Sequence, residues 1–177
     1  MKIERKWAIP NKWTFKIKPI AFLLQEEKAM GLMREGKWCD PFAGKLSPAD
    51  IRNDLNPENT AEFHLDALEF LRLQKTEDFD GVLFDPPYSF TQASKQYKNF
   101  GKEKLKVGLR SQPINKGYWT DVKKEVIRIL KSGGKIIQCG WNTNAFLKET
   151  GGEITRILIV AHGSGRNDTL VTVEIKN

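Results

Sequence analysis

The sequence predicts a single α/β domain built on a mostly parallel sheet. Short apolar runs alternate with helical segments along the 177 residues, which is typical of such sheets. Acidic residues follow three of these runs closely, at Asp40, Asp54 and Asp85. Two further runs, at residues 154–161 and 170–175, flank a turn-rich stretch and predict an antiparallel hairpin. Ligands bind beyond the carboxyl ends of parallel strands, so we expect the site near the three acids.

The individual elements follow from hydrophobic spacing and from turn residues. Apolar residues at helical spacing predict helices over residues 19–35, 67–73 and 118–131. Pro19 suits a first helical turn, and Gly133-Gly134 is expected to end the last helix. Strands are expected at residues 37–39, 51–55, 63–65, 81–84, 135–139, 154–161 and 170–175.

Composition limits the class of protein. Hydrophobic residues make up 40% and charged residues 29% of the chain, which indicates a globular domain, here taken as residues 1–177. The apolar runs, such as residues 20–24, are too short to span a bilayer. Two cysteines, Cys39 and Cys139, give neither a disulfide framework nor a zinc cluster. We therefore expect buried thiols in a reducing cytoplasm, no metal and no membrane contact.

The net charge of +7 is concentrated in two basic segments, residues 1–18 and 91–118. The second segment also contains the aromatic residues Tyr97, Phe100 and Tyr118 and the amides Gln92, Gln96, Asn99 and Gln112. Cations suit phosphates, aromatic rings suit bases and amides suit base edges, so residues 89–118 are interpreted as a nucleic-acid-binding insert. The alternative is a solvated loop. The expected contact residues are Lys95, Lys98, Lys102, Lys104, Lys106 and Arg110.

The tetrapeptide Asp85-Pro86-Pro87-Tyr88 directly follows an apolar strand. An exocyclic amine of a nucleobase is a poor nucleophile, because its lone pair is delocalised into the ring. A carboxylate and a rigid main-chain carbonyl can accept its two N–H bonds and free that lone pair. The aromatic ring offers a face on which a flipped base can stack. The alternative is a rigid turn with a packed aromatic ring.

This tetrapeptide resembles the catalytic motif of S-adenosylmethionine-dependent amino-methyltransferases, which act on the 6-amino group of adenine or the 4-amino group of cytosine in DNA. Residues 40–44, DPFAG, resemble the family's cofactor motif. Residues 52–57 and 66–68 are similar to its second and third acidic regions, and residues 14–19 to its N-terminal segment. Residues 162–169 resemble the closing hairpin of small phage-type adenine methyltransferases. The resemblance implies a Rossmann-like class I methyltransferase sheet.

The resemblance also implies roles for particular residues. Asp85 and the Pro86 carbonyl would accept the target amine, Pro87 would stiffen the turn, and Tyr88 would stack on the base. Asp54 would bind the ribose hydroxyls of S-adenosylmethionine, and Asp66 its adenine amino group. The full set of implied cofactor residues is Phe15, Lys18, Asp40, Pro41, Phe42, Gly44, Asp54, Leu55, Asp66 and Ala67.

Several of these residues also have structural readings. Asp40 and Asp54 suit turns at the ends of strands. Asp66 suits the N-cap of the helix at residues 67–73, and Phe42 suits a core position. Trp141 either lines the base pocket or belongs to the core. His162 is interpreted as a packing or turn residue without catalytic function.

The sequence departs from the family in two ways. About ten residues separate the DPFAG motif from Asp54, so the first helix of the fold is expected to be missing or reduced to a loop. We also expect no separate target-recognition domain, so the insert and the basic N-terminal segment are expected to bind DNA. The predicted activity is adenine-N6 methylation of DNA, with short or relaxed sequence specificity, in the cytoplasm of a bacterium or phage-infected cell.

Alternative activities are methylation of the 4-amino group of cytosine or of adenine in RNA. A further alternative is a non-catalytic nucleic-acid-binding protein on the same scaffold. Methylation of a protein side-chain amide is disfavoured by aspartate at position 85 and by the basic segments. The recognition sequence and the oligomeric state are not predicted.

Overall fold

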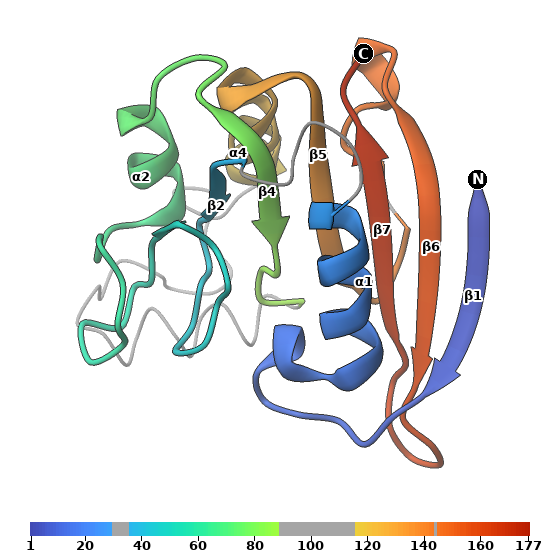
Figure 1. Cartoon of the computed structure of the whole chain (residues 1–177). Coiled ribbons are helices and arrows are strands. Elements are labelled where there is room, and N and C mark those ends of the chain that lie inside the picture. Colours follow the sequence, from blue (N-terminus) through green and yellow to red (C-terminus); the bar gives the residue numbers. More distant parts are fainter. Residues whose placement is uncertain (30–35, 89–115, 144) are drawn as a thin grey trace.

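A computed structural model of the chain describes residues 1–29, 36–88, 116–143 and 145–177. It contains one seven-stranded sheet in the order β1-β6-β7-β5-β4-β2-β3 (Figure 1). Among the described strands, β7 alone runs antiparallel to its neighbours, β5 and β6. This confirms the predicted sheet with its antiparallel C-terminal hairpin. The strands are β1 (Lys2–Trp7), β2 (Trp38–Asp40), β3 (Ile51–Arg52), β4 (Phe79–Phe84), β5 (Leu130–Gly140), β6 (Glu153–Ala161) and β7 (Thr169–Ile175).

Helices cover both faces of the sheet and give a three-layered core (Figure 1). Helix α1 packs on one face, where Ile20, Leu23 and Leu24 are buried. Helices α2 and α4 pack on the other face, where Phe70 and Val126 are fully buried. The helical elements are η1 (Thr14–Lys16), α1 (Lys18–Ala29), α2 (Ala67–Leu73), α4 (Lys116–Ile129) and η3 (Lys148–Thr150).

Strand β4 runs through the centre of this core. Successive side chains of a strand point to opposite faces of the sheet. Accordingly Val82 and Phe84 belong to the cluster on the α2 and α4 face, and Leu83 belongs to the cluster on the α1 face. A strand buried on both faces carries Asp85 to the edge of the sheet, where we expect the site.

Gly81 allows β2 and β4 to pack closely beside Trp38. The two residues are paired across these strands, and a Cβ atom at position 81 would lie 2.3 Å from the Trp38 ring. Trp38 is fully buried, so its ring cannot move aside easily. We expect Gly81→Ala to lower the free energy of unfolding by about 1–3 kcal/mol through overpacking, measured by urea denaturation.

Gly140→Ala is the matched control for this prediction. A Cβ atom there would come no closer than 3.8 Å to its neighbours, which is ordinary contact. Equal losses of stability in the two variants would contradict the packing explanation.

Strand β1 was not predicted. Residues 2–7 were treated as part of a basic segment, but they pair in parallel with β6 from Lys2↔Arg156 to Trp7↔Ala161. Most of its side chains are exposed, as expected for an edge strand, and it therefore lacks the apolar alternation that identifies other strands.

Other differences concern the limits of elements. The expected third strand at residues 63–65 is reduced to an isolated bridge, Asn53↔Phe63. The helix predicted at residues 19–35 corresponds to α1, which is described as far as Ala29. Residues 30–35 lie outside the described residues. Helix α4 ends at Ile129, so Gly133 and Gly134 lie within β5 and do not end the helix. None of the described helices combines the length and apolar character needed to cross a bilayer.

Candidate active site

A cavity of about 510 Å³ opens at the carboxyl ends of β2, β3 and β4, where the sequence places its acidic residues. Its walls come from the segments that follow these three strands and from an N-terminal segment around η1. The cavity therefore combines parts of the chain that are far apart in sequence. The lining includes residues 12–15, 41–44, 53–56 and 85–88, together with Leu46, Ser47, Asn59, Leu65 and Ala67.

The DPFAG turn is held by Asp40, which is fully buried and does not line the cavity. Its carboxylate accepts hydrogen bonds from the Phe42 N–H at 2.9 Å and from the Ser47 hydroxyl at 2.6 Å. Burial raises the pKa of Asp40 to about 7; these two hydrogen bonds oppose the shift, and the nearby carboxylates of Asp85 and Asp54 add to it. Asp40 therefore shapes the turn and places a titratable carboxyl just behind the cavity wall.

Asp54 connects the end of β3 to this turn. One carboxylate oxygen accepts from the Gly44 N–H at 2.7 Å and the other from the Asn56 N–H at 2.8 Å. Gly44 has a φ of +56°, a backbone conformation that favours glycine. The carboxylate thus remains at the cavity with spare lone pairs, where hydroxyl groups of a ligand can reach it.

Asn53 is a buried residue that sequence reasoning missed. Its side-chain NH₂ donates to the Pro41 carbonyl at 3.1 Å and to the Leu65 carbonyl at 3.0 Å, and its side-chain oxygen accepts from the Leu65 N–H. It therefore fixes three strand-end segments relative to one another. The signal in the sequence was an amide directly before Asp54 at the end of a strand.

Asp85 lies at the cavity directly after β4. The Tyr88 hydroxyl donates to its carboxylate at 2.5 Å, and the Thr14 side chain also hydrogen-bonds to it. Burial raises the pKa of Asp85, and these hydrogen bonds partly oppose the shift. Burial and the Asp85 charge also raise the pKa of Tyr88. The raised pKa of Tyr88 keeps its hydroxyl a neutral donor toward Asp85, which is a partly buried residue.

An aromatic pair extends from this turn. The Tyr88 ring lies edge-to-face with Trp141, with 5.6 Å between their centroids, and Trp141 is 45% exposed. Trp141 is therefore not a core residue, and it does not line the cavity, so neither of the two predicted roles is confirmed. Phe42, in the DPFAG turn, is partly buried, and its ring centroid lies 5.3 Å from that of Phe84. Phe42 both packs on the core and lines the cavity.

The N-terminal segment covers the DPFAG turn. A Cβ atom on Gly44 would lie 3.2 Å from the Trp13 ring, so the tryptophan packs closely over this glycine. Residues 45–50 contain turns and no helix, as predicted from the short spacing between DPFAG and Asp54. Lys12, Trp13 and Thr14 line the cavity, and none of them was selected individually from the sequence.

Asp66 caps helix α2, as one reading of the sequence proposed. Its carboxylate accepts from the Leu68 and Glu69 N–H groups, and the Tyr118 hydroxyl donates to it at 3.0 Å. The side chain does not line the cavity, although Leu65 and Ala67 on either side do. Tyr118 is buried in the core at the start of α4, so its interpretation as a nucleic-acid contact was wrong.

The structure thus brings together most of the predicted site. Lys18 lies away from the cavity, in a separate groove on the other side of η1. Lys95, Lys98, Lys102, Lys104, Lys106 and Arg110 lie outside the described residues. The residues that line the cavity as predicted are Phe15, Pro41, Phe42, Gly44, Asp54, Leu55, Ala67, Asp85, Pro86, Pro87 and Tyr88.

His162 and the cysteines have structural roles. His162 is buried, with Nδ1 2.8 Å from the Ala8 carbonyl oxygen and Nε2 2.9 Å from the Thr169 hydroxyl. Cys39 and Cys139 are buried free thiols. Within the described ranges, no three acidic, histidine or cysteine side chains are grouped so that they could bind a metal ion.

The fold is similar to that of several solved structures. TrmN from Thermus thermophilus is 16% identical with a TM-score of 0.57, over 91% of this chain and 49% of that protein. The 1,6-didemethyltoxoflavin-N1-methyltransferase of Burkholderia thailandensis, solved with S-adenosylhomocysteine, is 11% identical with a TM-score of 0.56, over 90% of this chain and 77% of that one. PH0226 from Pyrococcus horikoshii is 14% identical with a TM-score of 0.53, over 94% of this chain and 93% of that protein.

These similarities establish that the chain shares a Rossmann-like fold with these proteins, with a mostly parallel sheet and an antiparallel C-terminal hairpin. The chain spans about half the length of the Thermus protein. No protein-family model and no curated protein sequence matches it.

Proposed function

We propose that the protein transfers a methyl group from S-adenosylmethionine to the 6-amino group of adenine in DNA. The observation that carries this proposal is one cavity that contains both the Asp85–Tyr88 turn and the DPFAG turn with Asp54. The Asp85–Tyr88 turn is suited to hold an amine, and the DPFAG turn with Asp54 is suited to hold a nucleoside. The similarity to methyltransferase folds supports the proposal.

The cavity fits this cofactor by size and charge. Its volume of about 510 Å³ lies within the range of about 300–1,000 Å³ typical of small-molecule sites. Asp54 would accept hydrogen bonds from ribose hydroxyls, and the carboxylates of Asp40, Asp54 and Asp85 favour a cation. Phe15 and Trp13 would cover the methionine end of the cofactor, beside residues 45–50, which form turns in place of the helix expected after DPFAG. S-adenosylmethionine supplies an electrophilic methyl carbon bound to a sulfonium.

The protein's own residues would position the acceptor. Asp85 accepts one N–H bond of the target amine, and the Pro86 carbonyl accepts the other. The nitrogen then becomes pyramidal and its lone pair points toward the methyl carbon, so catalysis is largely a matter of positioning. Tyr88 and Trp141 would contact the flipped base by stacking. Once it carries the methyl group, the nitrogen would be acidic and its surplus proton would pass to Asp85 or to water, so Asp85 need not be a strong base.

Labelled methyl transfer tests the proposal. The chain is incubated with methyl-labelled S-adenosylmethionine and separately with double-stranded DNA, single-stranded DNA and RNA, and the nucleosides are identified by mass spectrometry. We expect N6-methyldeoxyadenosine. Label on cytosine or in RNA would show that the acceptor is not adenine in DNA. Cofactor binding without methyl transfer to any of these polymers would overturn the enzymatic proposal.

Cofactor affinity should depend on pH through Asp40. Its pKa of about 7 means that the carboxyl is partly protonated at neutral pH. A bound sulfonium favours the ionised form, so we expect S-adenosylmethionine to bind about three- to tenfold more tightly at pH 8 than at pH 6, measured by calorimetry. Because burial raises this pKa above its ordinary 3.8, the same group should stabilise the folded chain below about pH 4 and lose that contribution as the pH rises to about 7.

Two controls isolate this effect. S-adenosylhomocysteine has a neutral sulfur, so its affinity should change less over the same pH range. Asp40→Asn removes the titrating group, so the pH dependence of cofactor affinity and the pH dependence of stability should both become weaker. An equal pH dependence for the two ligands would show that the sulfonium charge is not involved.

A further inference from the structure

A second concave surface lies on the other side of η1 from the candidate active site. It has a volume of about 720 Å³ and is lined by β1, the loop at residues 8–11, the start of α1 and two residues of β6. We call it the N-terminal groove. Figure 1 shows β1 and the start of α1 flanking the lower part of the sheet, where this groove lies.

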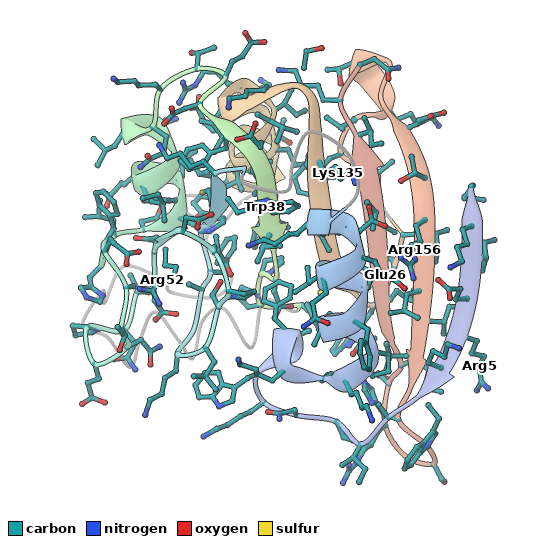
Figure 2. All side chains as sticks on the ribbon, viewed as in Figure 1. Arg5, Glu26, Trp38, Arg52, Lys135 and Arg156 are labelled. Carbon is teal, nitrogen blue, oxygen red and sulfur yellow. The ribbon has the colours of Figure 1, made fainter. Side chains whose placement is uncertain are left out.

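The groove has a rigid frame. The loop at residues 8–11 is anchored by the hydrogen bond from the Ala8 N–H to the Ala161 carbonyl, at 3.0 Å, and by the contact of His162 with the Ala8 carbonyl. Beneath the groove, Arg156 forms ion pairs with Glu4 at 2.6 Å and with Glu26 at 2.7 Å. Figure 2 shows Glu26 and Arg156 next to each other between α1 and the sheet. The surface is therefore largely preformed.

The groove carries unmatched positive charge. Its two acidic members, Glu4 and Glu26, both pair with Arg156, and the groove has four basic side chains, Lys6, Lys16, Lys18 and Arg156, against these two acidic ones. Its lysines, Lys6, Lys16 and Lys18, are exposed and form no ion pair with any other residue that the structure describes. An anionic partner would complement this charge.

Aromatic side chains are exposed among these lysines. Trp7 is 65% exposed and Phe22 is 55% exposed, although both are large apolar residues. Lys18 Nζ lies 6.0 Å from the centroid of the Phe22 ring. Sites for single-stranded nucleic acids combine lysines along the phosphate backbone with aromatic rings on which the bases stack. An acidic peptide would use the lysines but would have no particular need for both rings.

The groove and the candidate active site share one wall. Residues 12–15 line the cavity, and the residues that follow them, 16–19, line the groove. Lys12 Nζ lies 4.9 Å from the Trp13 ring centroid in that wall, which adds another cation and another ring. A strand bound in the groove would thus be close to the cavity that we assign to the target base.

We propose that the N-terminal groove binds the unpaired nucleotides that flank the target base. Their phosphates lie on Lys6, Lys16 and Lys18, and their bases stack on Trp7 and Phe22. The proposal rests on the proposed function, since it takes the cavity as the place of the target base. It assigns a substrate contact to the N-terminal segment independently of the insert at residues 89–118.

The test measures binding of a fluorescent single-stranded oligodeoxynucleotide by anisotropy without cofactor, over a series of salt concentrations. In the triple variant Lys6→Ala, Lys16→Ala, Lys18→Ala, the slope of log K against log salt should fall by about 2, because each single-strand phosphate contact contributes about 0.7. We expect about ten- to a hundredfold weaker binding near 0.1 M salt. Trp7→Ala and Phe22→Ala should each weaken binding at least about fivefold, with little effect on the salt slope.

The matched control is the triple variant Lys75→Ala, Lys124→Ala, Lys148→Ala, which removes three exposed lysines outside the groove. Circular dichroism and S-adenosylmethionine binding confirm that each variant is folded. Equal weakening in both triple variants, or unchanged affinity in the groove variants, would overturn the proposal. So would weakening by the lysine variants alone with both ring variants unchanged, which would indicate an acidic peptide or nonspecific charge.

The assay distinguishes this proposal from the enzymatic one. If the groove variants lose binding but the wild-type chain methylates no nucleic acid, the proposed function fails, and the groove remains a single-strand-binding site without the assignment to nucleotides beside a target base. If the wild-type chain methylates DNA and the groove variants keep its KM for a single-stranded oligonucleotide, the groove assignment fails and the proposed function stands.

Discussion

Replacing Asp85 with alanine is expected to reduce the rate of methyl transfer by about 10²- to 10⁴-fold and to leave S-adenosylmethionine binding within a few-fold of wild type. The carboxylate lies at the cavity but on the turn after β4, whereas the expected cofactor contacts come from the segments after β2 and β3. Its loss would remove an acceptor for the target amine, and the lone pair of that amine would stay delocalised. Single-turnover kinetics with labelled cofactor and calorimetry measure the two quantities separately.

Two further variants make the result specific. Asp85→Asn keeps the shape of the side chain but replaces one acceptor oxygen with a donor, so it should be nearly as inactive as Asp85→Ala. Tyr88→Phe removes the hydroxyl that donates to Asp85 and keeps the ring, so most of the activity should remain if the ring acts by stacking. A turnover within a few-fold of wild type for Asp85→Ala would show that the proposed mechanism is wrong.

Glu27→Ala is expected to lower the free energy of unfolding by about 3–5 kcal/mol. Glu27 lies on α1 with a buried side chain, and it accepts from Lys135 Nζ at 2.8 Å and from Arg156 at 3.3 Å. Lys135, on β5, has no other ion-pair partner among the residues that the structure describes. Without Glu27, its ammonium group would stay buried without a counter-charge. Urea or thermal denaturation measures the loss.

The double variant Glu27→Met, Lys135→Met tests the cause. If the loss arises from an uncompensated charge, removing both charges should restore most of the stability, because apolar side chains often replace a buried ion pair at little cost. Glu26→Ala is the exposed control: its side chain is 55% exposed, and Arg156 retains Glu4 and Glu27. It should cost no more than about 1 kcal/mol. A double variant as unstable as Glu27→Ala would contradict the explanation.

Elements with a strong local signal were predicted from the sequence. Helix α2 begins at Ala67, as expected, because Asp66 supplies its N-cap. Strands β4 to β7 were found from short apolar runs bounded by turn residues. Strand β1 was missed because its charged residues and exposed position resemble a basic tail. Its place in the sheet depends on pairing with β6, which local spacing cannot show.

The candidate site divides in the same way. The Asp85 and DPFAG turns were predicted because each is a local motif at the end of a strand. The contacts of Trp13 over Gly44 and of Thr14 with Asp85 join distant segments, so no spacing in the sequence indicated them. Tyr118 was misinterpreted for a related reason: it follows a run of lysines, but the start of α4 places it in the core against Asp66.

The pairing of β1 with β6 has a consequence for how the molecule forms. The ion pair between Glu4 and Arg156 joins residues 152 positions apart in the chain. Closing so long a loop is slow, because its entropy must be lost before its contacts are gained. During synthesis, β1 cannot pair until β6 has left the ribosome. The N-terminal groove is lined by both β1 and β6, so it cannot be complete before most of the chain has been made.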